Sequence, residues 1–137
     1  MIIKEPGLLN QLSEMLYDEC FEDDDISFDS NSMVFTVTFY RESVKKRKLI
    51  SKTFFLKKYR VPFYKRELHV MNAVSYSIKN HRKADLYVLH CIEYDDDEKT
   101  VSIIASNPII EVKVTDLEIR LEDSDEICFE REKFSIF

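Results

Sequence analysis

Glycine is nearly absent from this chain, with one glycine in 137 residues. Glycine-rich phosphate loops, such as the P-loop and the dinucleotide fingerprint, need several glycines at fixed spacing, so the sequence excludes both devices. Turns that require a positive φ must be built from Asn, Asp or Ser instead. There is also no apolar run of about 18 residues, so we predict no membrane-spanning helix and no membrane partner.

Cysteine and histidine are also scarce and poorly placed for chemistry. Cys20, Cys91 and Cys128 are widely spaced and form no CxxC pair, which is typical of reduced cytoplasmic thiols. His90 precedes Cys91, but neighbouring strand residues point to opposite faces, so we predict neither a metal site nor a cofactor. No nucleophile–base pattern is present, so we expect a protein that is not an enzyme. The N-terminus does not resemble a leader sequence, which also favours a cytoplasmic location.

The three histidines are predicted to be structural or exposed, with His69 facing solvent and His90 partly buried in an apolar strand. His69 faces away from the apolar residues of its predicted strand, and His81 lies in a polar turn. The acidic runs 22–25 and 95–98 lack the glycine of a calcium-binding loop, so we expect them to be solvated turns.

The spacing of apolar residues predicts one N-terminal helix followed by strands. The helix is expected over about residues 6–20, and it should cover an open edge or end of a sheet. Beyond residue 25 the period becomes two, which is typical of strands. Breaks are predicted at Pro62 and at the turn 122–126, and a parity switch near Asp116 predicts a β-bulge. The expected strands are 26–29, 33–41, 48–59, 66–80, 86–95, 100–106, 109–121 and 127–137.

These elements predict a mainly β fold (α+β by count) in a single domain over 1–137. The strands would form an antiparallel sandwich or a partly open barrel of 7–8 strands, with one N-terminal helix. Segments 26–39 and 92–105 share a hairpin pattern, either from an ancient duplication that made two hairpin-led halves or because both obey the same physics. The predicted inward-facing residues are Phe35, Val37, Phe39, Phe54, Val70, Val74, Ile92, Ile103, Val112, Val114 and Ile119.

Charge is strongly polarised along the chain. Residues 1–40 carry one basic and nine acidic side chains, 41–83 carry fourteen basic and two acidic, and 84–137 carry five basic and fifteen acidic. In the stretch 45–66, ten of 22 residues are basic and five are aromatic. One interpretation is that basic and acidic strands pair side by side, which needs no function. The other is a basic face that binds a partner.

The function predicted from this pattern is non-enzymatic binding of a protein partner that carries an acidic patch, or of a second copy of the chain. The alternative is a nucleic-acid binder that contacts phosphates, although the overall net charge of −6 opposes it. An uncharacterised enzyme is the third interpretation. Both binding hypotheses use the same candidate residues: Lys45, Lys46, Arg47, Lys48, Lys57, Lys58, Arg60, Lys65 and Arg66.

Overall fold

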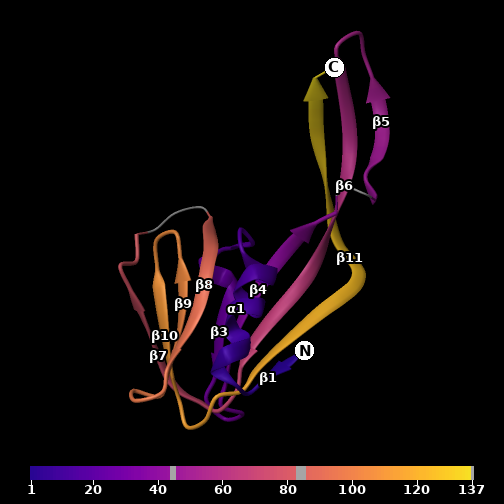
Figure 1. The fold of residues 1–137 in the computed structure, drawn as a ribbon. Helices are drawn as coiled ribbons and strands as arrows, with labels where there is room; N and C mark the ends of the chain where they lie inside the picture. Colours follow the sequence, from indigo (N-terminus) through magenta and orange to yellow (C-terminus); the bar gives the residue numbers. More distant parts are fainter. Residues whose placement is uncertain (44–45, 83–85, 137) are drawn as a thin grey trace. The chain divides into compact units, whose positions relative to one another are not determined.

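The computed structural model describes residues 1–43, 46–82 and 86–136, and the chain divides into two compact units. Unit 1 contains Met1–Phe39 and Glu67–Glu122, and unit 2 contains Tyr40–Arg66 and Asp123–Phe137. The predicted mainly β, antiparallel architecture with one N-terminal helix is confirmed (Figure 1). That the two units form one folding domain stays a prediction.

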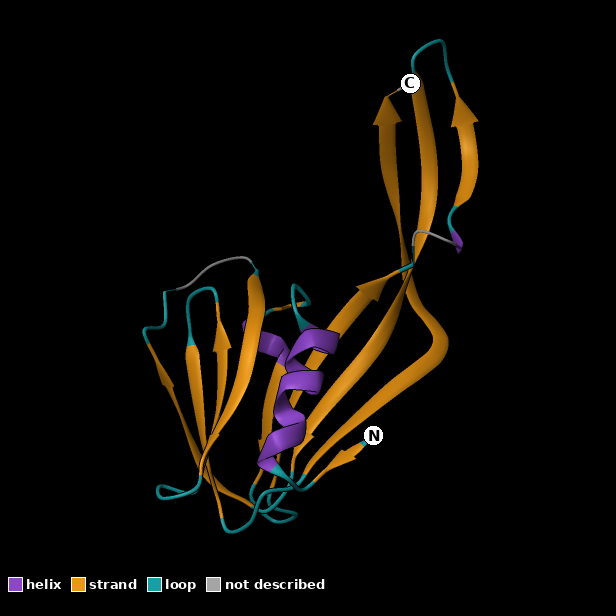
Figure 2. Cartoon of the chain, viewed as in Figure 1, coloured by secondary structure: helices purple, strands orange, loops and turns teal. Residues whose placement is uncertain are grey.

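Unit 1 is a curved antiparallel sheet with one helix against it (Figure 2). The strand order is β1-β11-β6-β4-β2-β8-β9-β10-β7, and β3 pairs with β4, so the described strands do not close into a barrel. Unit 2 contains β5, the part of β6 up to Arg66 and the part of β11 from Asp123, with β6 between the other two (Figure 1). The bounds are β1 (Ile2–Ile3), β2 (Cys20–Phe21), β3 (Ile26–Asp29), β4 (Val34–Glu42), β5 (Lys48–Lys52), β6 (Leu56–Val70), β7 (Ala73–Lys79), β8 (Tyr87–Asp95), β9 (Thr100–Ala105), β10 (Ile109–Val114) and β11 (Ile119–Ile136).

The helical segment is shorter than predicted. A 3-10 turn, η1 (Pro6–Leu8), leads into α1 (Leu9–Leu16), and a second 3-10 turn, η2 (Asp23–Asp25), precedes β3. The helix ends at Leu16 because the next residue is extended and Asp18 adopts a positive φ of 66°. Three leucines at the i, i+3, i+4 spacing bury its inner face: Leu9, Leu12 and Leu16. Among the described residues, no helix has the length and apolarity needed to cross a bilayer.

The core lies in unit 1, and nine of the eleven predicted inward-facing residues are buried there. The predictions for Phe54 and Val74 are wrong, since their exposed fractions are 99% and 54%. Phe54 lies in a turn between β5 and β6, where no strand covers it. Val74 lies at a register shift between β7 and β10: Val114 pairs with Ala73 and Lys113 pairs with Ser75, so Val74 is left out of the pairing and Ala73 is the buried residue.

Two of the predicted strands are in fact hairpins. The segment 48–59 turns between β5 and β6, where Thr53 N–H donates to Leu56 C=O at 2.8 Å. The segment 66–80 turns between β6 and β7 at Asn72. The end of the first segment and the start of the second belong to one strand, β6, so these two segments contain three strands; with the two-residue strands β1 and β2, there are eleven described strands rather than seven or eight.

Three predicted interruptions are also wrong. Strand β6 runs through Pro62, whose carbonyl accepts a hydrogen bond from Ser43 N–H at 3.0 Å. Strand β11 runs through the predicted turn 122–126. The parity switch near Asp116 is no bulge: it is a turn between β10 and β11, which pair with different neighbours. A change of partner strand therefore produced the signal that we interpreted as a bulge.

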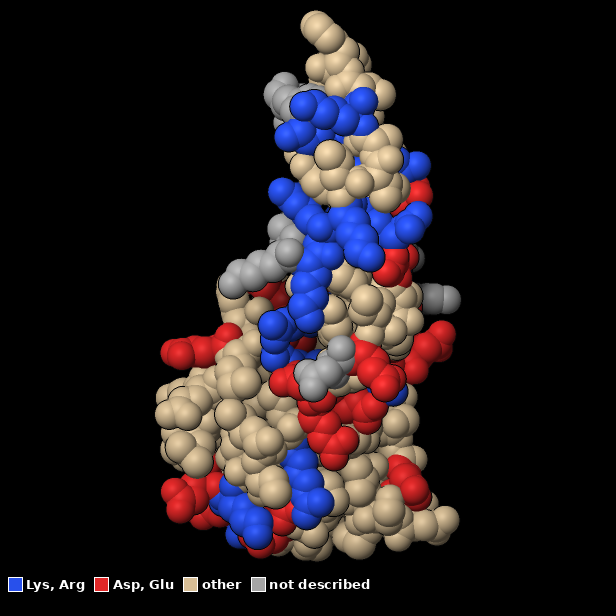
Figure 3. Space-filling view, turned by 90° about the vertical axis from the view of Figure 1, so that its right-hand side faces the viewer, with Lys and Arg blue, Asp and Glu red and all other residues tan. Residues whose placement is uncertain are grey.

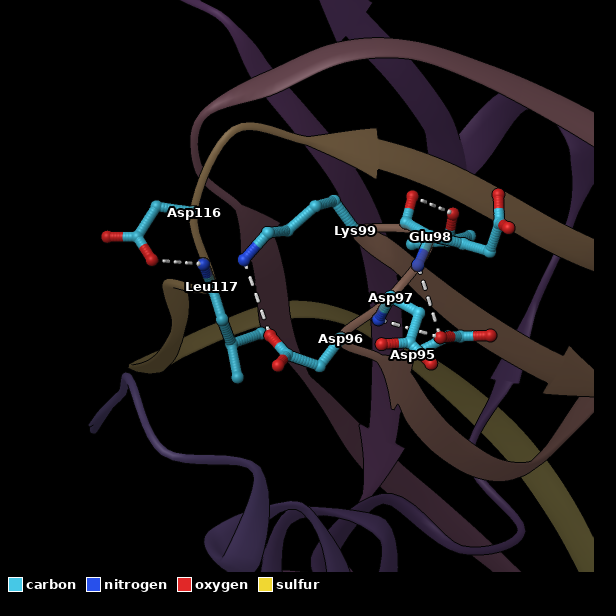
Figure 4. A network of polar contacts seen from close by, with 8 residues as sticks. Asp95, Asp96, Asp97, Glu98, Lys99, Asp116 and Leu117 are labelled. Carbon is cyan, nitrogen blue, oxygen red and sulfur yellow. Dashed lines mark hydrogen bonds and ion pairs between the residues drawn. The ribbon is translucent and has the colours of Figure 1, made fainter.

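The two hairpins that share a sequence pattern also share a turn. In the β3–β4 turn, Asp29 Oδ1 accepts backbone N–H groups two and three residues later, at 3.0 and 3.3 Å. In the β8–β9 turn, Asp95 Oδ1 accepts the equivalent groups at 3.0 and 3.2 Å (Figure 4). Each turn then reaches a residue of positive φ, Met33 in one and Lys99 in the other. Local physics is sufficient to produce this agreement, and both it and the duplication hypothesis stay predictions.

Candidate functional site on unit 2

The division into units separates the charges of the chain. Unit 2 contains 13 basic and 6 acidic residues, a formal net charge of +7, whereas unit 1 contains 7 basic and 20 acidic residues, a net charge of −13. On the face drawn in Figure 3, Lys and Arg side chains gather mainly over unit 2, and Asp and Glu gather mainly over unit 1. Most of the basic middle segment of the sequence therefore belongs to unit 2, and most of the acidic residues on either side of it belong to unit 1.

A basic pocket lies in unit 2 between residues of β4, β6 and β11. Its volume is about 230 Å³, and its described lining contains four cationic side chains and one carboxylate. The carboxylate, Asp123, is bound by Arg66, whose side chain is almost fully buried. Three of the predicted site residues meet here. The lining residues are Arg41, Ser43, Lys46, Tyr64, Lys65, Arg66, Asp123 and Ser124.

Other predicted site residues form ion pairs with β11. Lys58 Nζ lies 2.8 Å from Glu132 Oε2, and Arg60 Nε lies 3.4 Å from Glu130 Oε2. These pairs arise because β6 and β11 are neighbouring strands, so the cross-strand interpretation holds for these residues and for Arg66. Half-exposed pairs of this kind contribute about 0–1 kcal/mol each to stability. They neutralise some of the basic side chains of unit 2 but leave its net positive charge unexplained.

Like charges also face one another across β5 and β6. The pairing register places Lys48 opposite Arg60 and Lys52 opposite Lys57. Like charges directly opposite in an antiparallel pair are destabilising, so the stability of the hairpin does not account for them. Their effect is to raise the positive potential along β5, every residue of which is exposed.

Aromatic rings hold two further cations in place. The Arg47 guanidinium lies 4.1 Å from the centroid of the Tyr59 ring, and Lys46 Nζ lies 4.9 Å from that of Tyr64. Such contacts stabilise a cation by about 0.5–1 kcal/mol at exposed sites and limit its movement. Lys45, the ninth predicted site residue, lies outside the described residues.

Exposed apolar side chains accompany these cations, and the sequence analysis did not assign them to a surface. Phe54 and Phe55 occupy the β5–β6 turn with exposed fractions of 99% and 62%. Leu49 and Ile50 are exposed on β5, as are Ile127 and Phe134 on β11. The available signal was the pair of phenylalanines between two lysine-rich runs, in a segment too short to be one more buried strand.

Unit 2 has little core of its own. Val61 and Pro62 are the buried apolar residues among its described positions. The Phe63 and Phe129 rings stack across β6 and β11 with a centroid separation of 4.8 Å, and Arg131 lies 5.2 Å from the Phe129 centroid. Surface stacking and strand pairing therefore stabilise this unit more than burial does.

In the acidic turn 95–98 of unit 1, predicted to be a solvated turn, two aspartates accept hydrogen bonds from groups of the turn and of Lys99. Besides the Asp95 bonds described above, Lys99 Nζ donates to Asp96 Oδ1 at 3.3 Å (Figure 4). This hydrogen bond, together with the charge of Asp96, raises the pKa of Lys99 above its ordinary value. The side chains of this exposed turn are thus engaged in shaping it.

The environment of Cys91 does not activate its thiol, and two of the histidines contact neighbouring polar side chains. Burial, followed by the charge of Glu93, raises the pKa of the Cys91 thiol, which is opposite to the change that activates a cysteine. His81 Nε2 lies 2.8 Å from the Tyr87 hydroxyl and 3.0 Å from Asp23 Oδ1. The prediction that His69 faces solvent is wrong, because its side chain is 17% exposed and contacts Thr36.

A comparison of the chain with known protein families, curated proteins and solved structures finds no match. The function must therefore be inferred from the geometry of the two units.

Proposed function

We propose that the protein is a non-enzymatic binding domain in which unit 2 docks onto an acidic surface of a partner protein. The observation that carries this proposal is the mixture, on one small unit, of a net charge of +7 and several exposed apolar side chains, among them Phe54. Aromatic anchors and arginines, with a charged rim, are the typical composition of a protein interface. A cytoplasmic location is part of the proposal and agrees with the three free cysteines.

The basic pocket suggests how the partner is recognised. Arg41, Lys46 and Lys65 surround a space large enough for a carboxylate side chain, and the Arg66–Asp123 pair forms one wall. An Asp or Glu of the partner would exchange its water for these donors, whereas Phe54 would enter an apolar depression. Charge would then steer the encounter, and the apolar contacts would set the lifetime of the complex.

A second copy of the chain is one specific partner of this kind. Unit 1 carries a net charge of −13, so unit 2 of one molecule is complementary in charge to unit 1 of another. Such a contact would be head to tail, and it would produce rings or open chains rather than a two-fold dimer.

A nucleic-acid backbone is the second candidate, and the exposed Phe54 and Phe55 beside Lys52 and Lys57 favour it. Phosphates would bind the lysines, and the rings would stack on bases. The exposed aliphatic residues Leu49 and Ile127 have no role in phosphate binding, so the protein partner accounts for more of the surface.

The test places a photoreactive phenylalanine analogue at position 54 and, as a matched control, at position 74, which is an exposed apolar position of unit 1. We expect a discrete protein adduct from position 54 only. Lys48→Glu should weaken that adduct, and Lys4→Glu in unit 1 should leave it unchanged. Sedimentation at roughly 50 and 200 mM salt measures self-association, and fluorescence anisotropy with oligonucleotides at the same salt concentrations measures nucleic-acid binding.

Each outcome decides between the candidates. Adducts or self-association that depend on Phe54 and Lys48 support a protein partner. Oligonucleotide binding that falls steeply with salt, without a protein adduct, replaces the proposal with the phosphate-binding function. The absence of both kinds of binding overturns the assignment of unit 2 as a binding surface.

A further inference from the structure

Three potential metal ligands of unit 1 converge at one point. Glu67 and His69 are two residues apart on β6 and share a face, and Glu122 lies on the neighbouring strand β11. His69 Nε2 is 3.3 Å from Glu67 Oε2 and 3.5 Å from Glu122 Oε2. One donor atom from each of the three residues lies within 4.8 Å of the other two. Glu122 is more than 50 residues away from the other two in the sequence, so spacing alone did not reveal the cluster.

Two of the three separations between donor atoms suit a small divalent cation, and the third, between Glu67 and Glu122, lies within 4.8 Å. Zinc binds imidazole nitrogen and carboxylate oxygen at about 2.0–2.2 Å, usually with tetrahedral geometry. In a tetrahedron of that size, two ligand atoms are about 3.3–3.6 Å apart. The two measured distances from His69 Nε2 fall in this range. A cation could therefore be accepted without moving the imidazole relative to either carboxylate.

A fourth residue orients the histidine. His69 Nδ1 lies 2.9 Å from Thr36 Oγ1 on β4, so the ring is held by a hydrogen bond on the side opposite to the two carboxylates. When Nδ1–H donates to Thr36, the lone pair of Nε2 points toward the carboxylate oxygens, and three acceptors face one another. Metal-binding histidines are typically oriented by this kind of outer hydrogen bond.

Burial limits the site on one side and leaves it accessible on the other. The His69 side chain is 17% exposed and Glu67 is 29% exposed, whereas Glu122 is 69% exposed. The positions of Glu67 and His69 are thus fixed by their burial in the sheet, and the exposed Glu122 side chain can move to fit the ion. Three protein ligands would leave a coordination position for water, as in sites that are not purely structural.

We propose that Glu67, His69 and Glu122 bind a divalent transition metal of the zinc class, with Thr36 as a positioning residue. The imidazole ligand favours zinc, cobalt or nickel over calcium and magnesium, which prefer oxygen ligands alone. Bound metal would join β6 to β11 within unit 1 and would stabilise that strand pair.

The experiment uses the full chain, stripped of metal with a chelator and titrated separately with Zn²⁺ and Co²⁺. Isothermal calorimetry should show one equivalent of Zn²⁺, and the Co²⁺ form should show the visible absorption of a tetrahedral site, without a thiolate charge-transfer band. His69→Gln and Glu122→Gln should each weaken binding at least tenfold, and Thr36→Val should weaken it by about tenfold. Glu122 is largely exposed, so its variant should fold normally.

Matched controls come from the other two histidines. His81→Gln removes a histidine that also contacts a carboxylate, Asp23, and His90→Gln removes an exposed one. Both variants should bind Zn²⁺ as the unaltered chain does. The proposal is overturned if the unaltered chain binds neither metal, or if His69→Gln binds as tightly as the His90→Gln control. In either case the three side chains form an ion-pair cluster and nothing more.

Discussion

At the residue scale, the scarcity of glycine places strain on particular turns. Within the described ranges, five non-glycine residues have a positive φ, and three of them are Asn or Asp, as predicted: Asp18, Asn72 and Asn80. The other two, Met33 and Lys99, have side chains that fit this conformation less well. Both occupy the same position relative to an aspartate, Asp29 or Asp95, that accepts two backbone N–H groups. The aspartate therefore stabilises turns that lack a glycine.

The contribution of Asp29 should depend on pH. Hydrogen bonds from the Ser32 side chain and backbone, and from Asn31 N–H, lower the pKa of Asp29 below its ordinary value. Because the folded pKa is the lower one, the stabilisation is complete above the unfolded pKa and is lost as the pH falls through the folded pKa. Asp29→Ala should therefore lower the urea midpoint at pH 7, with a smaller difference from the unaltered chain at pH 3.

Urea titrations monitored by circular dichroism at the two pH values measure this difference. Asp24→Ala, in the exposed turn η2, is the matched control and should show a smaller loss at pH 7. A loss for Asp29→Ala that is equally large at pH 3 would contradict the assignment to the ionised carboxylate.

At the element scale, the N-terminal segment completes one edge of β8, as expected for a helix that covers an open edge. Strand β2 pairs with only the first two residues of β8, Tyr87 and Val88. Further along, Leu89 N–H donates to Glu19 C=O at 2.9 Å. Beyond that point α1 takes over: Ile92 N–H donates to Ser13 Oγ at 2.9 Å, and the hydroxyl approaches Ile92 C=O at 3.3 Å. The Ser13 hydroxyl thus satisfies the backbone N–H and C=O groups of Ile92 where no neighbouring strand pairs with them.

Ser13→Ala should destabilise the protein by about 2 kcal/mol, because it leaves the backbone N–H of the buried residue Ile92 without this acceptor. Chemical denaturation monitored by circular dichroism measures the change in the free energy of unfolding. Ser27→Ala, on the exposed face of β3, is the control and should change it by less than about 0.5 kcal/mol. Equal effects of the two substitutions would show that α1 does not depend on this contact.

At the scale of the whole molecule, the apolar core and the positive charge occupy different units. The cluster of fully buried residues belongs to unit 1, whereas unit 2 depends on strand pairing and stacked rings. Because unit 2 buries few apolar side chains, the free energy needed to open it locally should be small. A surface that is stabilised by binding, rather than by its own core, is consistent with the proposed docking role.

Unit 2 should therefore exchange its backbone hydrogens faster than unit 1. We expect peptides from 46–60 and 126–136 to reach full deuteration at least tenfold sooner than a peptide from 100–114, which covers β9 and β10. Hydrogen exchange followed by mass spectrometry makes this comparison within one sample. Equal protection of both units would show that the stacked rings and ion pairs of unit 2 stabilise it as much as a buried core does.

The sequence by itself determined the local features. Alternation at period two predicts most of the strands, the leucine spacing predicts α1, and the acidic run after Tyr94 predicts a solvated turn. These features depend on residues close together in the chain, so their physics is visible in a short window. The excess of positive charge in 45–66 is likewise a property of composition.

Only the tertiary structure decided which distant residues meet. Pro62 lies within a strand and Phe54 at an exposed turn, because strand pairing, not local propensity, sets where β6 begins and ends. Lys58 meets Glu132, and His69 meets Glu122, because β6 and β11 are neighbours, although more than 50 residues separate the two members of each pair. Alternation shows which side a residue faces but not which strand lies beside it, so both candidate sites depend on a pairing that no local pattern specifies.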